Sequence, residues 1–334
     1  MHTGQTYKLR ELLLWTRRNI YWLLLTAIIP TILYEGFGLK WLTLPFAVVA
    51  LLGTATAFMV GFKNASTYGR TWEARQIWGA AMGASKSWAI LCRDLIDDSR
   101  SRELVYRHLG WMTALRYQLR AERSWEASNK SYFKEYMQYY SIPEKETPLK
   151  EELARYISKG ELEMVLSKKN PAYQLLSLQG SALTKLYNDG SLEHFNYLTL
   201  HGALREFCEH QGKSERIKNF PYPRQYATIN SLLVKLFCIL LPFALLGEFN
   251  ELNDEVTGML KGHMVWFVIP FSLLLSWIYT SLDQIGESTE NPFEGSANDV
   301  PISQLSRATE IDIREMLGER EIPEALQPKN NIVL

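Results

Sequence analysis

The sequence lacks a net charge, because its 36 lysines and arginines balance 36 aspartates and glutamates over 334 residues. A nucleic-acid-binding protein would carry a basic excess, and an acidic disordered tail would carry the opposite one, so neither class is expected. Cysteine is also scarce. Cys92, Cys208 and Cys238 are widely spaced and form no CxxC pair, which favours a reduced protein without a disulfide framework.

Enzyme signatures are missing as well: there is no nucleophile elbow, P-loop, dinucleotide fingerprint or HExxH sequence. His201, Cys208 and His210 lie in one expected helix, but Cys208 and His210 are two positions apart and cannot share a helix face. His108 and His194 lie among apolar residues and are expected to be core histidines. We therefore expect no enzyme, no metal site and no cofactor.

What the sequence does contain is long apolar runs. Four segments are expected to span a membrane: 20–34, 41–62, 226–247 and 263–282. The second is 22 residues without a charge and would cover roughly 33 Å as a helix. The first is marginal in length, and the third contains one charge, Lys235. The alternative is four buried helices of a large soluble core.

Basic flanks give an orientation. Lysines and arginines precede the first segment, follow the second and precede the third, so these flanks are expected to be cytoplasmic. The links 35–40 and 248–262 then lie outside, and both termini lie inside. The expected organisation is a membrane part at 1–62 and 226–282, a cytoplasmic helical domain at 63–225 and a cytoplasmic C-terminal segment at 283–334.

The stretch between the second and third segments shows helical periodicity rather than strand alternation. A long helix is expected to continue from the second segment, followed by helices at about 102–122, 149–167, 172–188 and 191–212. An amphipathic stretch follows the break at 290–293. The fold class is therefore an all-α integral membrane protein with a large cytoplasmic helical domain.

One face of the second segment presents Thr54, Phe58 and Phe62 at intervals of four residues. Small residues are interleaved with them: Gly53, Ala55, Ala57 and Gly61. If several copies of this helix surround an axis, the rings would form an apolar constriction that gates by dewetting. The alternative is that these side chains pack against lipid or other helices.

The run GFKNASTYGRTWEARQIWG at 61–79 resembles the motif that ends the second transmembrane helix of bacterial bestrophin homologues. Shorter pieces at 12–15, 220–223 and 291–293 extend the resemblance over nearly the whole chain. The motif residues are Lys63, Asn64, Tyr68, Arg70, Trp72, Glu73 and Arg75.

The resemblance implies a homopentamer with one central pore, in contact with membrane lipid, in the inner membrane of a bacterium. It also places the pore neck on Thr54, Phe58 and Phe62, with Thr54 in place of the usual aliphatic residue. A second, cytoplasmic aperture would fall near Gln174.

Eukaryotic bestrophins are calcium-activated anion channels whose calcium clasp is an acidic run after Asn-Pro-Phe. The corresponding stretch here, 294–299, has only two carboxylates, Glu294 and Asp299, whereas calcium takes six to eight oxygens. We therefore expect calcium-independent, passive conduction of small monovalent ions, either an anion such as chloride or a monovalent cation. A membrane scaffold or sensor without conductance is the alternative.

Overall fold

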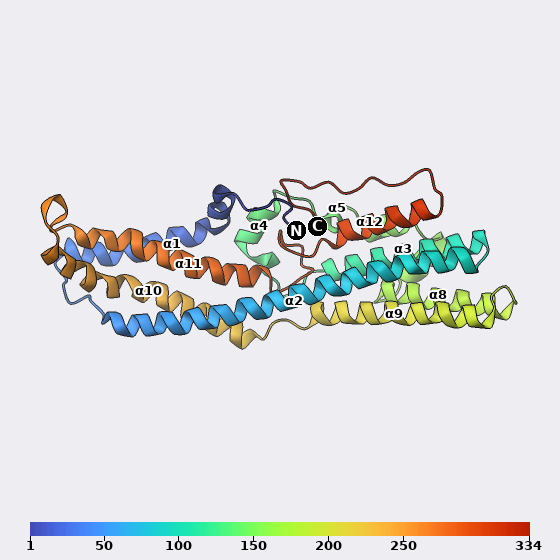
Figure 1. The fold of residues 1–334 in the computed structure, drawn as a ribbon, viewed down its shortest axis with the longest axis horizontal. Helices are drawn as coiled ribbons and strands as arrows, with labels where there is room; N and C mark the ends of the chain where they lie inside the picture. The colour runs from blue at the N-terminus through green and yellow to red at the C-terminus, as the bar shows by residue number, and fades with distance from the viewer. The chain divides into compact units, whose positions relative to one another are not determined.

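The structure is a computed structural model that describes residues 1–334, with the side chains of all except Asn129 and Ser131. Its regular structure is helical, and the only β-pairing in the described residues is two isolated bridges, which confirms the all-α expectation. The long helices are α1 (Leu9–Glu35), α2 (Phe46–Leu95), α3 (Asp98–Arg120), α8 (Pro171–Asn188), α9 (His194–Asn219), α10 (Arg224–Glu255), α11 (Val268–Ser288) and α12 (Ile302–Met316) (Figure 1). The short ones are η1 (Ala127–Asn129), α4 (Ser131–Met137), α5 (Pro143–Glu146), α6 (Leu149–Leu153), α7 (Lys159–Leu166), η2 (Gly258–Leu260) and η3 (Met264–Phe267).

The chain divides into two compact units. The first unit comprises residues 1–4, 70–221 and 291–334, and the second comprises residues 5–69 and 222–290. Helix α2 runs through the boundary without interruption, so the expected continuation of the second apolar segment as a helix is confirmed.

In the second unit, α1, α10 and α11 lie side by side (Figure 1). Polar side chains join α11 to α1: Trp277 Nε1 donates a hydrogen bond to Thr16 Oγ1 at 2.9 Å, and Gln284 Nε2 donates to the Trp15 carbonyl at 3.0 Å. Three stretches in the described residues are long and apolar enough to cross a membrane, namely 46–95, 224–255 and 264–288. Helix α1 is not among them because charged residues bound its short apolar run, so a span there stays a prediction.

Two sequence expectations about helix limits are wrong. The helix expected at 149–167 is broken, because α6 ends at Leu153 and α7 begins only at Lys159, where Ser158 caps it by accepting a hydrogen bond from the Glu161 N–H at 3.4 Å. Helix α10 continues to Glu255, so much of the expected 248–262 link is helical.

In the first unit, α3 packs against α8 and α9 around an aromatic core. His108 on α3 is fully buried against the rings of Trp88, Trp111 and Phe207. Burial lowers the pKa of His108 to about 3, so the ring is neutral, and Nε2 lies 2.8 Å from the Ser85 hydroxyl. The expectation of a core histidine is confirmed at His108 and wrong at His194, which is exposed at the start of α9.

The segment between α11 and α12 is buried although it is rich in polar residues. Glu294 accepts a hydrogen bond from the Ala127 N–H at 3.0 Å through Oε2, while Oε1 has no partner among the described side chains. Burial raises the pKa of Glu294 well above its usual range, and the nearby carboxylates of Asp299 and Glu126 raise it further. Glu294 therefore favours its protonated form in the folded chain.

This raised pKa predicts a pH-dependent stability. Above the unfolded pKa of 4.5 the unfolded chain releases the Glu294 proton more readily than the folded chain, so the native protein loses stability as the pH rises. Glu294→Gln has no proton to lose. We expect thermal unfolding to show the variant stabilised relative to the native protein by about 1 kcal/mol or more at pH 8, with a smaller difference at pH 5.

The matched control is Glu163→Gln, which changes an exposed carboxylate on α7. It should leave the melting temperature unchanged at both pH values. A Glu294→Gln variant that is less stable than the native chain at pH 8 would contradict the assignment of a protonated Glu294.

Candidate functional site

Helix α2 has one face that packs within the second unit. Its buried residues are Val49, Gly53, Thr56, Val60, Lys63 and Thr67. A Cβ at Gly53 would stand 2.7 Å from Cε2 of Phe237, and the Tyr279 hydroxyl donates a hydrogen bond to the Gly53 carbonyl at 3.2 Å. Only glycine allows this close approach of α10 and α11 to α2.

Among the described residues of the second unit, none covers the opposite face of α2. Thr54 is exposed, and Phe58 and Phe62 are 67% and 57% exposed. The two phenyl rings contact each other edge to face, with centroids 4.7 Å apart. A Cβ at Gly61 would meet no atom within 4 Å, so this face is open to a neighbour, a pore or lipid.

Lys63 fixes the rotation of α2 within this unit. Its side chain is 3% exposed, and its Nζ lies 2.7 Å from Oδ1 of Asp283 on α11. Asp283 Oδ1 also accepts a hydrogen bond from Asn230 Nδ2 on α10 at 2.6 Å. One carboxylate thus joins three helices, and with Lys63 directed inward, its chain neighbour Phe62 is directed outward.

Asn64 sets the axial register of the same contact. Its Nδ2 donates a hydrogen bond to the Leu282 carbonyl at 3.1 Å, and its Oδ1 would stand 2.2 Å from a Cβ at Gly286. Any larger residue at Gly286 would displace the side-chain amide of Asn64 from its contact with α11.

Other residues of the 61–79 motif hold α2 to α9 in the first unit. Arg70 donates hydrogen bonds to the carbonyls of Ile217 and Phe220, at 3.0 and 2.8 Å, where α9 ends. A cation at a helix C-terminus satisfies free carbonyls and opposes the helix dipole. Glu73 forms an ion pair with Arg216. The remaining motif side chains, Tyr68, Trp72 and Arg75, are exposed.

Gln174, the predicted aperture residue, is half-buried in the first turn of α8. The start of this helix is fixed by Asn170, whose Oδ1 accepts hydrogen bonds from the Tyr173 N–H at 3.1 Å and from Gln211 Nε2 at 3.3 Å. Asn170 Nδ2 in turn donates to Glu215 at 3.0 Å. Sequence reasoning did not single out this amide network.

In the acidic stretch after α11, at 294–299, the Asp299 carboxylate is fully hydrogen-bonded by groups of the chain itself. Asp299 Oδ1 accepts hydrogen bonds from the N–H groups of Phe293 and Val300, both at 2.6 Å. Its Oδ2 accepts from the Gly295 N–H at 2.7 Å and from Arg120 Nη1 at 2.6 Å. An ionised carboxylate has about four acceptor positions, so those of Asp299 are all used within the chain.

No metal centre forms among the side chains that the structure describes, since no group of three or more His, Cys, Asp or Glu residues converges. His201, Cys208 and His210 are not brought together, and His210 Nε2 instead lies 3.4 Å from Glu206 Oε1. Sequence reasoning also missed Asp283 and Asn230. A signal existed for Asp283, because it is an acidic residue directly after the last apolar segment.

A family model described as "Bacterial/Fungal Bestrophin protein" matches residues 16–315. The chain belongs to this bestrophin family. Among its relatives, the voltage-dependent anion channel-forming protein YneE of Escherichia coli is 30% identical over 303 residues, covering 90% of this chain and 85% of that protein. A similarly named protein of Mesorhizobium japonicum is 25% identical over 318 residues, covering 90% of each chain.

Solved bestrophin structures have the same fold. The crystal structure of a bacterial bestrophin homologue from Klebsiella pneumoniae aligns with a TM-score of 0.75 and 25% identity, covering 91% of this chain and 99% of that one. The resemblance read from the 61–79 motif is thus confirmed. The names of the bestrophin's relatives also agree with the expectation of a channel rather than an enzyme.

Removing the Lys63–Asp283 ion pair should lower the free energy of unfolding. Lys63→Met leaves the Asp283 carboxylate, which is only 16% exposed, without its cation, and this is expected to cost about 2–4 kcal/mol, somewhat less than for a fully buried charge. Adding Asp283→Asn removes the orphaned charge and keeps an acceptor for Asn230, so the double variant should recover much of the loss. Thermal unfolding of the bestrophin in detergent measures both changes.

Lys86→Met is the matched control, because the Lys86–Asp312 pair is 40% and 45% exposed and should contribute only about 0–1 kcal/mol. Equal destabilisation by Lys63→Met and Lys86→Met would show that the Lys63–Asp283 pair does not hold α2 in place.

Proposed function

We propose that this chain is a subunit of an anion channel, and that five copies surround one central pore. The observation that carries the proposal is the uncovered face of α2, where Thr54, Phe58 and Phe62 project away from the chain's own core. The names of the relatives support an anion as the conducted ion. In this proposal passive flux of a small monovalent anion, such as chloride, passes between rings of these side chains.

The neck acts as a hydrophobic constriction. Rings of Phe58 and Phe62 exclude water when narrow, and a dewetted constriction blocks ions without a physical plug. Thr54 donates its hydroxyl hydrogen to the Ala50 carbonyl at 3.0 Å, which leaves oxygen lone pairs as its remaining polar character. The neck is therefore apolar at two of its three levels and slightly wettable at the third.

The proposed topology has four membrane-spanning helices in a cell membrane, with α1 as the first. The Trp277–Thr16 and Gln284–Trp15 hydrogen bonds support this, because they tie α1 to a helix that is apolar enough to span. Both termini would be cytoplasmic, and residues 63–225 and 283–334 would form the cytoplasmic part. Gln174 is the proposed aperture residue, at the start of a helix fixed by Asn170.

Calcium independence follows from the chemistry of Asp299. A hard cation needs several free oxygens, and the four acceptor positions of Asp299 are used by three N–H groups and Arg120. Glu294 favours its protonated form, which is a poor cation ligand. In the proposed channel, Arg120 gives the segment after α11 a permanent positive partner.

Channel recordings test the neck. Purified protein in a planar bilayer under a potassium chloride gradient should give a current that reverses near the chloride equilibrium potential. Phe58→Ala and Phe62→Ala widen the constriction, and a barrier lowered by about 1.4 kcal/mol raises the rate roughly tenfold, so we expect a several-fold larger current. Thr54→Val, which removes the hydroxyl without changing the shape, should lower it.

Phe271→Ala is the control, since Phe271 is a 49% exposed phenylalanine on α11 rather than on α2. It should leave the current unchanged. A native protein that stays silent in bilayers would favour a scaffold without conductance, and a current indifferent to Thr54, Phe58 and Phe62 would place the constriction elsewhere.

Calcium should have no effect on the native current. We expect the same open probability in a calcium chelator and at millimolar free calcium. The reason is that the Asp299 carboxylate already accepts hydrogen bonds from Arg120 and three backbone N–H groups. Magnesium at equal concentration controls for screening of surface charge by a divalent cation. Activation by calcium alone would overturn the proposed role of Arg120.

A further inference from the structure

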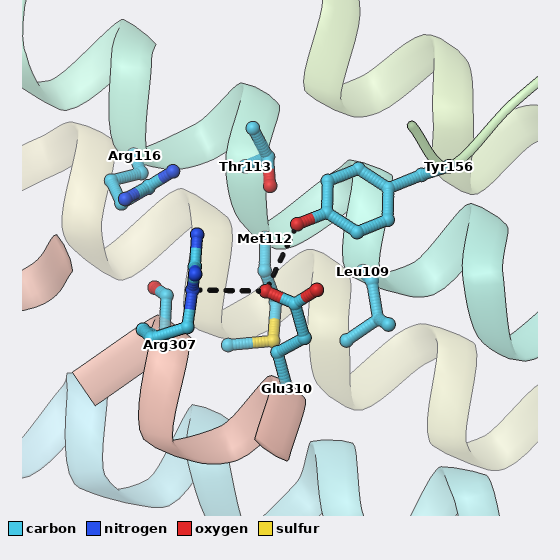
Figure 2. Close-up of a pocket in the computed structure, with 8 residues that line it drawn as sticks. Leu109, Met112, Thr113, Arg116, Tyr156, Arg307 and Glu310 are labelled. Carbon is cyan, nitrogen blue, oxygen red and sulfur yellow. Dashed lines mark hydrogen bonds and ion pairs between the residues drawn. The ribbon is translucent and has the colours of Figure 1, made fainter. Parts of the chain in front are cut away.

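Cations in poorly solvated parts of this bestrophin have carboxylate partners. Beside a small cavity between α3 and α12, Arg307 pairs with Glu310 at 3.2 Å (Figure 2). The buried Arg116 at the same cavity pairs with Glu144 at 3.0 Å. Lys63 in the second unit is paired as well. An unpaired charge away from water is costly, so a cation without a carboxylate in such a place needs an anion from outside the chain.

Lys235 on α10 has no carboxylate partner. It lies within the apolar part of a helix that is long and apolar enough to cross a membrane (Figure 1). Lys235 is exposed, and it makes no ion pair with the side chains that the structure describes. The exposed residues around it are apolar: Ile229, Leu232, Leu236 and Ile239. An ionisable residue on such a face is a candidate functional residue.

Polar residues continue from Lys235 toward the start of α10. Ser231 precedes Lys235 by four positions and Thr228 precedes it by seven, so all three lie on one face of the helix. Arg224 lies on the same face at the first position of α10, where it forms an ion pair with Glu290. We call these four residues, Arg224, Thr228, Ser231 and Lys235, the polar stripe. It leads from the end of the helix into the apolar span.

The depth of Lys235 follows from Asn230. Asn230 Nδ2 donates to Asp283 Oδ1 at 2.6 Å, and the same oxygen pairs with Lys63, so polar groups meet at this level. Lys235 is five residues further along α10, which is about 7.5 Å. Side chains of a helix tilt toward its N-terminus, so the long stem of Lys235 lets the ammonium reach back toward that polar level. Lipid phosphates border the apolar layer at such a level.

A second copy of the chain has no carboxylate to offer Lys235 within the span. The apolar segments 20–34, 46–62, 226–247 and 264–282 contain no aspartate or glutamate. A copy that packed on this face would therefore present apolar or uncharged side chains to the ammonium. A phospholipid would present a phosphate, and its acyl chains would cover the exposed leucines and isoleucines beside Lys235.

We propose that the polar stripe binds the headgroup of an anionic phospholipid, with the phosphate held by the Lys235 ammonium and the Ser231 hydroxyl. Arg224 is already paired with Glu290, so Lys235 supplies one positive charge that a lipid with one net negative charge balances. The inference rests on the proposed topology for its choice of the cytoplasmic leaflet, because α10 begins on that side. It does not rest on conduction.

Native mass spectrometry ranks the bound lipids. The full chain in a neutral maltoside detergent is titrated with phosphatidylglycerol and, separately, with phosphatidylcholine of the same acyl chains. The native protein should bind phosphatidylglycerol more tightly. Lys235→Met should weaken phosphatidylglycerol binding about fivefold, because one basic residue near an anionic lipid contributes about 1 kcal/mol. Lys235→Arg keeps the charge and should keep the preference.

Lys168→Met is the matched control, because Lys168 is an exposed lysine of the first unit, just after α7. It should bind both lipids as the native chain does. An equal preference for phosphatidylglycerol in the native chain and in Lys235→Met would overturn the proposal. A smaller assembly formed by Lys235→Met, seen in the same spectra, would also overturn it, because Lys235 would then contact a second copy.

Thermal unfolding separates a lipid from a free anion. Phosphatidylglycerol should raise the melting temperature of the native chain more than phosphatidylcholine does, because a ligand that binds only the folded state stabilises it. Lys235→Met should lose half or more of this difference. Inorganic phosphate without lipid should give the same shift in both chains, and a shift that required Lys235 would identify a free anion and overturn the lipid site. Neither measurement requires a current, so failure here leaves the channel proposal standing and the reverse also holds.

Discussion

The orientation of α2 depends on an ion pair between the buried Lys63 and the partly buried Asp283. Burying two charges is costly, and such a pair is stable only when its remaining hydrogen-bonding positions are filled. Here Asn230 fills one of them, and the pair joins α2, α10 and α11 at one point. Apolar packing alone would tolerate a rotated α2, since several of its faces carry small or apolar residues. A buried charge tolerates one rotation only.

The close contacts near this pair also fix the orientation of α2. Gly53 admits Phe237, and Gly286 admits Asn64. Both glycines remove a side chain where two helices meet, which lets Phe237 and Asn64 pack directly against the backbone of the facing helix. The exposed phenyl rings of Phe58 and Phe62 are the other consequence, because a helix held firmly on one side can present bulky apolar groups on the other.

Much of this could be predicted from the sequence. The apolar runs predicted the long apolar helices that begin at Phe46, Arg224 and Met264. The 61–79 motif predicted membership of the bestrophin family. Helix limits were less predictable: the break between Leu153 and Lys159 is set by the Ser158 cap rather than by periodicity. His194 was predicted to be buried because its neighbours in the sequence are apolar. The structure exposes both His194 and its neighbour Phe195, which is 79% exposed. Partners distant in sequence, such as Asp283 for Lys63 or Arg120 for Asp299, require the folded chain.

The segment that follows α11 is held in a conformation it would not adopt alone. Phe293 has a φ of 108°, a region that side-chain-bearing residues rarely occupy and that costs about 1–3 kcal/mol. Asp299 supports this backbone through three N–H groups, and Arg120 of α3 holds Asp299. During synthesis α3 leaves the ribosome long before this segment does. Helix α3 with Arg120 is therefore synthesised before the strained turn at Phe293. The turn can form its hydrogen bonds to Asp299, and Asp299 its bond to Arg120, as soon as the turn emerges.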